Sequence, residues 1–299
     1  MKSLKTLSDA IVPPVGLGTF PFQGRKMADV VKSALKNGYR LIDTSDDYRG
    51  EKGIGIAISE LGELGLKRED IFVQTKITDN DSYLDEPLSG VYFNKYSSFM
   101  KKHTVEEIVR EKVCDSLYEM KIDYLDSLLI HQPYPDFIEE IWDVFIKLKK
   151  EGVVRYIGVS NFYARHLEQL RNTEVFPEIN QIYLSPIGIR QSDVDYCNNH
   201  GVQLMTYSPL IDIRTGRLPK SSPIFKDLQN KYNKTLSQII LRWNIDRGSM
   251  PMARSSNTLR QKENIDIQDF CLTKEEVENI SSLNENYQYL PTSTICPGF

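Results

Sequence analysis

Short apolar runs alternate with longer amphipathic segments along most of this 299-residue chain. Several runs, 127–130 among them, lack the regular polar alternation of a half-exposed strand. This is typical of parallel strands that are covered on both faces. The pattern predicts eight strands, at residues 15–19, 40–43, 71–75, 126–130, 156–159, 179–182, 203–206 and 249–252. Eight strands that alternate with helices indicate an α/β protein with a closed (β/α)₈ TIM barrel.

Helix starts are legible between the strands. Thr104 and Glu107, and again Thr273 and Glu276, stand at the spacing of a capping box. Apolar residues recur at helical spacing after the first of these, and segment 235–243 is also amphipathic. Because no linker or repeat divides the chain, we expect one barrel domain over residues 1–299. We also expect a hairpin at 2–14 that plugs the barrel floor, and long segments at 79–103 and 288–299.

Composition narrows the choice of partners. The formal net charge is −4 and no long run of Lys or Arg occurs, which argues against nucleic acid and anionic membranes. The four cysteines and four histidines have neither CxxC nor metal-ligand spacing, so no metal is expected. The sequence shows no apolar stretch typical of a signal peptide or a membrane span. We therefore expect a cytoplasmic protein that acts on a small molecule, as a monomer or weak homo-oligomer.

Polar side chains follow most of the predicted strands. The carboxyl ends of barrel strands meet at one face, and reactive residues of barrel enzymes lie there. One such residue can be accidental, whereas a ring of them on successive strands predicts a site at this face. The residues are Asp43, Lys76, His131, Ser160, Asn161, Gln181 and Tyr207.

The types of these residues suggest acid–base chemistry. Lys76 and Asp43 can form a pair, and the charge of Lys76 is expected to lower the pKa of a nearby tyrosine from about 10. Tyr48 follows Asp43 in the same loop, so it can donate a proton to a developing alkoxide. His131 can orient or polarise a carbonyl. Each residue alone also has a structural explanation, but the combination favours catalysis.

Other common chemistries lack their motifs. No G-x-G-x-x-G follows the first predicted strand, since the glycines at 16 and 18 have no third partner. The chain also has no P-loop, no H-E-x-x-H and no G-x-S-x-G.

From residue 16 to about 283 the chain resembles the aldo-keto reductase family. Segment 38–51 is similar to the first family signature, which carries Asp43 and Tyr48, and Lys76 matches the catalytic lysine. Segment 123–133 resembles the second signature, which contains His131. Segments 158–162, 180–182 and 207–210 also match. The resemblance implies a (β/α)₈ barrel that uses NAD(P)H and no metal.

The resemblance also implies roles for these residues. Tyr48 would be the general acid, Lys76 would lower its pKa, Asp43 would hold Lys76 and contact the cofactor, and His131 would position the carbonyl. The nicotinamide carboxamide would be held by Ser160, Asn161 and Gln181. The remaining cofactor contacts would come from Tyr207, which stacks on the ring, and from Ser208 and Leu210.

Segment 254–264 resembles the part of the family that binds the adenosine 2′-phosphate. Arg254 stands where most members have Lys, and the matching residues are Ser255, Arg260 and Asn264. Because Arg can hold phosphate bidentately, NADP is expected over NAD. Ile211 and Asp212 occupy positions where the family often has a small residue and a phosphate-binding Ser. A carboxylate there is unfavourable, so the pyrophosphate is expected to be held differently.

Phe20 and Gln132 replace tryptophans that are common in the substrate pocket of the family, and 79–103 is expected to form a substrate lid. A rim loop or an oligomer contact is the alternative for that segment. The expected reaction is reduction of an aldehyde or ketone by NADPH. Alternatives are an NAD(P)⁺-dependent dehydrogenase for a sugar or hydroxy compound, and a cofactor-sensing regulatory barrel. The complete catalytic group argues against a purely binding role.

Overall fold

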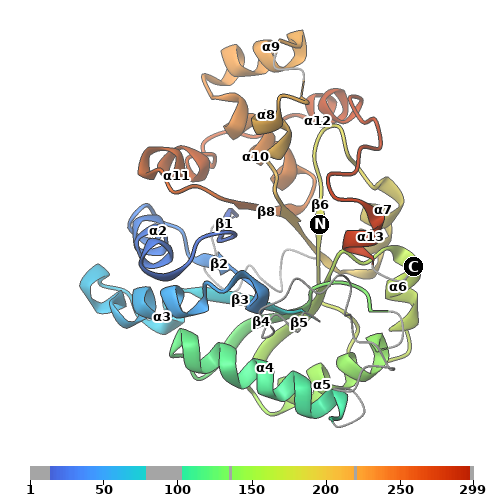
Figure 1. Ribbon diagram of the computed structural model, residues 1–299. Coiled ribbons are helices and arrows are strands. Elements are labelled where there is room, and N and C mark those ends of the chain that lie inside the picture. Colours follow the sequence, from blue (N-terminus) through green and yellow to red (C-terminus); the bar gives the residue numbers. More distant parts are fainter. Residues whose placement is uncertain (1–13, 79–102, 135–136, 219–220, 297–299) are drawn as a thin grey trace.

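The computed structural model describes residues 14–78, 103–134, 137–218 and 221–296. Eight parallel strands pair in chain order and close into a barrel, as predicted. Figure 1 shows the strands at the centre of the molecule with helices around them. The strands are β1 (Gly16–Gly18), β2 (Leu41–Asp43), β3 (Phe72–Ile77), β4 (Leu125–Ile130), β5 (Val154–Ser160), β6 (Ile179–Tyr183), β7 (Gln203–Tyr207) and β8 (Ser249–Ala253).

Every predicted strand overlaps an observed one. The carboxyl ends of β3, β5 and β7 run one or two residues beyond the predicted ends. Lys76, Ser160 and Tyr207 therefore lie within strands instead of just after them. The hairpin expected at 2–14 and almost all of the segment 79–103 lie outside the described residues.

Helices connect the strands and continue after the last one. Between β7 and β8 the chain forms three helices, and α9 lies at the outer edge of the molecule in Figure 1. The helices are α2 (Gly24–Lys36), α3 (Glu51–Ser59), α4 (Val105–Met120), α5 (Ile138–Lys150), α6 (Ala164–Gln169), α7 (Gln191–His200), α8 (Ile211–Thr215), α9 (Pro223–Tyr232), α10 (Leu236–Asp246), α11 (Thr258–Ile265), α12 (Lys274–Ser281) and α13 (Thr292–Ile295). Short 3-10 turns lie at η1 (Asp46–Tyr48), η2 (Leu61–Leu64) and η3 (Arg68–Asp70).

Reciprocal capping begins three of these helices. Thr104 accepts from the Glu107 N–H at the start of α4, while the Glu107 carboxylate accepts from the Thr104 N–H. The same exchange begins α12 with Thr273 and Glu276. Both predicted capping boxes are confirmed. Thr235 begins α10 in the same way, which satisfies backbone donors that a helix start otherwise leaves free.

The core lies between the strands and the helices, with a smaller apolar layer inside the barrel. Close approach of α3 to α4 depends on Gly55, because a Cβ there would lie 2.1 Å from the Glu119 carbonyl oxygen. The inner layer fills the barrel below the site and consists of Leu41, Phe72, Leu129, Ile179, Met205, Met250 and Met252. Within the described residues, no helix is both long and apolar enough to cross a membrane.

The chain folds back onto the barrel after α12. The N–H groups of Glu285 and Tyr287 both donate to the Ile187 carbonyl in the loop between β6 and α7, at 3.0 Å. Gly188 makes room for this contact, since a Cβ there would lie 2.4 Å from the Tyr287 carbonyl oxygen. The tail thereby reaches the carboxyl ends of the strands.

Candidate active site

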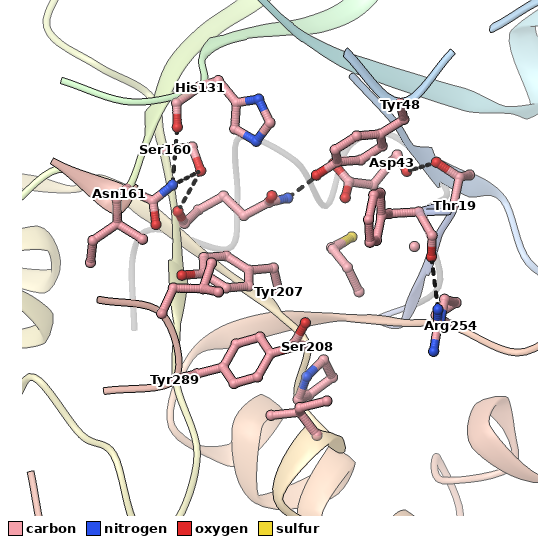
Figure 2. Close-up of a pocket in the computed structure, with 18 of the residues that line it drawn as sticks. Thr19, Asp43, Tyr48, His131, Ser160, Asn161, Tyr207, Ser208, Arg254 and Tyr289 are labelled. Carbon is pink, nitrogen blue, oxygen red and sulfur yellow. Dashed lines mark hydrogen bonds between the residues drawn. The ribbon is translucent and has the colours of Figure 1, made fainter. Parts of the chain in front are cut away.

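A cavity of about 460 Å³ opens at the carboxyl ends of the strands. In Figure 2, Tyr48 and His131 lie above this space, and Tyr207, Ser208 and Tyr289 lie below it. Most residues predicted from the sequence line the cavity, namely Phe20, Asp43, Tyr48, His131, Gln132, Ser160, Asn161, Gln181, Tyr207, Ser208, Leu210 and Arg254.

Lys76 and Asp43 form a buried ion pair on the floor of this cavity. Lys76 Nζ lies 2.7 Å from Asp43 Oδ1, and the two side chains are 1% and 6% exposed. Lys76 also donates to the Thr44 carbonyl at 2.7 Å. The same Asp43 oxygen accepts from Gln74 Nε2 at 2.7 Å and from Gln181 Nε2 at 3.0 Å. Such added hydrogen bonds offset the desolvation that makes a buried pair costly.

Gln74 is a site residue that the sequence analysis missed. Its amide oxygen accepts from the Ser127 hydroxyl at 2.7 Å while its amide nitrogen holds Asp43. Both residues are fully buried inside the barrel. A polar amide in a run that otherwise reads as a buried strand was the available signal.

Tyr48 sits at the end of the turn η1. Its ring centre is 5.2 Å from Lys76 Nζ, and its ring lies 5.7 Å from that of His131 in an edge-on arrangement. Burial raises the pKa of Tyr48 well above 10, and the charge of Asp43 adds to the rise. This direction is opposite to the expected lowering, because burial of the hydroxyl disfavours the charged phenolate. A phenol with a raised pKa stays protonated at neutral pH, as a proton donor must.

His131 is neutral over the whole physiological range. Burial, aided by the charge of Lys76, lowers its pKa to about 3. Its Nδ1 lies 2.6 Å from the Thr78 hydroxyl oxygen and 3.1 Å from that of Ser45. Neither hydroxyl was singled out from the sequence. Nε2 lies on the opposite side of the ring, away from both of them.

Asn161 and its neighbours form a group of amides and hydroxyls on the β5 and β6 side of the cavity. The Asn161 backbone is left-handed, with φ of 64°, and Nδ2 donates to the His131 carbonyl at 3.0 Å. Its Oδ1 is buried and has no hydrogen-bond partner in the described part of the chain. An orphaned buried acceptor needs a donor, and the amide N–H of a nicotinamide carboxamide is one. Ser160, Asn161 and Tyr207 thus fit the nicotinamide end of the expected cofactor.

Two arginines line the opposite end of the cavity. Arg254 follows β8, and Arg214 comes from α8. Burial lowers the pKa of Arg254, and the nearby charge of Arg214 lowers it further. Arg254 donates to the Phe20 carbonyl at 3.1 Å, but neither guanidinium has a carboxylate partner among the residues described. Paired cations of this kind suit phosphate groups. Arg214 was not among the residues predicted from the sequence.

Asp212 does not face this phosphate-suited end. Its carboxylate is buried and accepts from the Tyr183 hydroxyl at 2.6 Å. The acid that looked unfavourable for a phosphate is thereby held inside the barrel rim. Because α8 is helical, Arg214 two residues later reaches the cavity instead.

The other residues expected at the 2′-phosphate do not line the cavity. The Ser255 hydroxyl bonds to the backbone of Asn257, and the Asn257 side chain accepts from the Arg260 N–H to begin α11. Asn264 is buried within α11, where the Tyr39 hydroxyl donates to the Gln261 carbonyl at 3.2 Å. Their role in binding the adenosine end stays a prediction.

The tail supplies one wall of the cavity, which no sequence pattern had indicated. Tyr289, Leu290 and Ile295 line it. The next residue, Cys296, is buried with its Sγ 3.7 Å from the Asn161 carbonyl oxygen. This wall therefore packs directly against Asn161.

Comparisons with known proteins agree with this geometry. The family model described as "Aldo/keto reductase family" matches residues 14–285. A glyoxal reductase from Bacillus subtilis (strain 168) is 35% identical over 282 residues, covering 94% of this chain and 92% of the relative. A methylglyoxal reductase from Escherichia coli (strain K12) is 32% identical over 292 residues, covering 96% and 95%. A crystal structure of a Bombyx mori aldo-keto reductase in complex with NADP has a TM-score of 0.77 at 31% identity, covering 95% of this chain and 92% of that one. The chain therefore belongs to the aldo/keto reductase family of oxidoreductases.

Proposed function

We propose that this chain reduces aldehydes or ketones to alcohols with NADPH, and that Tyr48 is the general acid. The observation that carries the proposal is one cavity lined by a protonated tyrosine, a neutral histidine and Asp43, with Lys76 held in a buried ion pair by Asp43. These are the parts that proton transfer to a carbonyl oxygen requires.

Bound NADPH would supply a hydride to the carbonyl carbon. The neutral ring of His131 and the hydroxyl of Tyr48 would both hold the carbonyl oxygen, which fixes the substrate for reaction. As negative charge develops on that oxygen, Tyr48 would transfer its proton to it. Lys76, held by Asp43, would then stabilise the phenolate that remains. Tyr207 would cover one face of the nicotinamide and leave the other to the substrate.

Several contacts support NADP over NAD. Arg214 and Arg254 line the cavity and bring to it two charges that have no carboxylate partner among the described residues. Guanidinium groups bind phosphate through charge-assisted hydrogen bonds. The related Bombyx mori structure is a complex with NADP.

Small polar dicarbonyls are the substrates that the pocket favours. Gln132 lines the cavity next to His131, so its amide can bind a second carbonyl or a hydroxyl of the substrate. A purely apolar substrate would leave this amide unpaired, at a cost of about 1–3 kcal/mol. Two of the relatives are a glyoxal reductase and a methylglyoxal reductase.

A turnover screen of the full-length chain tests the proposal. NADPH and NADH would each be offered with glyoxal, methylglyoxal, an apolar aldehyde of similar size and a set of sugars, and the cofactor absorbance followed. We expect the highest kcat/KM with NADPH and a dicarbonyl. Tight NADPH binding without turnover of any carbonyl would favour the cofactor-sensing alternative, and turnover only with NAD(P)⁺ and a sugar or hydroxy compound would favour the dehydrogenase.

A further inference from the structure

Two hydroxyl groups lie next to Nδ1, one of the two ring nitrogens of His131. His131 Nδ1 is 2.6 Å from Thr78 Oγ1 and 3.1 Å from Ser45 Oγ, and the two hydroxyl oxygens are 3.0 Å apart. Ser45 is fully buried and Thr78 is 8% exposed. Because little solvent reaches this spot, these hydroxyls decide which hydrogen bond Nδ1 makes.

Asp46 orients the two hydroxyl-bearing residues Ser45 and Thr78. Its carboxylate accepts from the Thr78 backbone N–H at 3.1 Å and from the Ser45 hydroxyl at 3.3 Å, and it is itself paired with Lys112 of α4 at 3.1 Å. The Lys76 carbonyl is a further acceptor for Ser45, at 3.4 Å. Both of these partners of Ser45 can only accept, so the Ser45 proton points toward them.

The Thr78 proton then has two acceptors to choose between. Ser45 Oγ is 3.0 Å away, and His131 Nδ1 is 2.6 Å away. The shorter contact is the stronger one, and its length is typical of a hydroxyl donor and short for a ring N–H donor. Thr78 is therefore the donor and Nδ1 the acceptor.

We propose that Thr78 is a positioning residue that sets the tautomer of His131 by donating to Nδ1 and so keeping the ring proton on Nε2. This inference rests on the proposed function, in which His131 holds the carbonyl oxygen of the substrate. With the proton on Nε2 the ring donates to that oxygen, whereas the other tautomer would turn a lone pair toward it. A neutral imidazole has one donor nitrogen and one acceptor nitrogen, and the partner of one decides the state of the other.

Nitrogen NMR of the histidine-labelled chain, without substrate, tests the tautomer directly. A His131→Gln spectrum identifies the His131 signals among those of the four histidines. We expect a protonated Nε2 and an unprotonated Nδ1 in the wild type. Thr78→Val removes the hydroxyl at nearly constant size and should bring in the other tautomer, while Thr78→Ser should restore the wild-type spectrum.

Thr75→Val is the matched control. Thr75 lies three residues earlier, within β3, is fully buried, and donates its hydroxyl to Glu51 at 2.6 Å on the outer face of the barrel. We expect both valine variants to lose stability but only Thr78→Val to change the His131 signals. The kcat of Thr78→Val should fall roughly two- to tenfold, which corresponds to the loss of one hydrogen bond. Its affinity for NADPH should be unchanged.

The tautomer and the proposed reaction can fail separately. A wild-type His131 that carries its proton on Nδ1, or one whose tautomer is the same in Thr78→Val, would overturn the inference whatever the activity. A wild type that reduces no carbonyl while keeping Nε2 protonated would instead reject the proposed function.

Discussion

One carboxylate oxygen organises the floor of the site. Asp43 Oδ1 accepts from Gln74, Lys76 and Gln181 within 3.0 Å. Taking a charged pair out of water costs several kcal/mol per ion, and neutral donors help to offset this cost. The neutral donors are the side-chain amides of Gln74 and Gln181, which add no charge of their own to the site. Lys76 Nζ is held 5.2 Å from the ring centre of Tyr48.

Tyr48→Phe removes the proton donor and leaves the cavity otherwise intact. We expect turnover to fall by the ~10²–10⁴-fold usual for general acid catalysis. NADPH affinity, followed by fluorescence titration, should change little. Turnover close to that of the wild type would show that another group supplies the proton.

Gln132→Leu tests the substrate preference. The leucine keeps the size of the side chain but cannot bind a second carbonyl, so we expect kcat/KM to drop for glyoxal and methylglyoxal. The apolar aldehyde should lose nothing, because it made no use of the amide. Comparing the two kcat/KM ratios checks this, and equal changes for both substrate types would contradict it.

Helices and strands could be predicted because they depend on local sequence patterns. The roles of individual side chains in the cavity could not, where they depend on contacts between residues distant in sequence. Thr104 and Glu107 reveal the start of α4 because the capping exchange spans only three residues. The role of α8 could not be inferred, since its Asp212 turns inward only because Tyr183 from β6 meets it. Arg214, two residues later on the same helix, lines the cavity.

The helix α8 should therefore contribute to cofactor binding. Arg214→Ala and Arg254→Ala should each weaken the binding of NADPH by roughly 1.5–3 kcal/mol, which is the usual contribution of a hydrogen bond to a charged group. Arg217→Ala is a suitable control, because Arg217 is close by but lies over the Tyr287 ring, 4.1 Å from its centre, and does not line the cavity. Titration with NADPH and NADH checks this. Arg254→Ala should weaken NADH binding less than NADPH binding. Equal losses of affinity for the two cofactors would show that Arg254 does not contact the 2′-phosphate.

The contact between α3 and α4 gives a stability prediction. Gly55→Ala would push a methyl group against the Glu119 carbonyl, which lies 2.1 Å from the ideal Cβ position. Overpacking of this kind typically costs about 1–3 kcal/mol. Gly62→Ala is the control, because nothing lies within 4 Å of its Cβ position. Urea unfolding should separate the two variants, and equal midpoints would mean that the helices simply move apart.

For the whole molecule, the order of the strands was enough to predict that polar side chains at the strand ends would meet at one face. Parallel strands in a closed barrel end at one face, so Asp43, Lys76 and His131 had to converge. The direction of the Tyr48 pKa could not be predicted in this way, because burial outweighs the charge of Lys76. The place of Tyr289 could not be predicted either, since the tail meets the barrel through contacts distant in sequence, such as those of Glu285 and Tyr287 with Ile187.

Glu51 gives the molecule a pH-dependent stability. Its carboxyl is buried at the start of α3, and burial raises its pKa to about 7, although the hydroxyls of Thr75 and Ser116 donate to it. The folded state therefore favours the protonated form. This contribution to stability is fully present below pH 4.5 and is lost as the pH rises to 7.

Glu51→Gln mimics the protonated form and should remove this loss. We expect the variant to exceed the wild type by roughly 1–3 kcal/mol above pH 7, and to match it near pH 4.5. Glu111→Gln, at an exposed position of α4, is the control and should show no such trend. Urea unfolding at both pH values checks this, and a constant difference across the range would contradict it.

The neighbouring charges of Arg214 and Arg254 also affect how the protein should be handled in solution. Two cations that lack carboxylate partners in the described structure attract any small dianion in the buffer. Inorganic phosphate or sulfate would then compete with the nucleotide, while added salt would screen the attraction over about 10 Å at 0.1 M. Michaelis constants for the nucleotide should thus be higher in phosphate than in a zwitterionic buffer of equal ionic strength. Purification without sulfate or phosphate should therefore leave these two arginines available to the proposed cofactor.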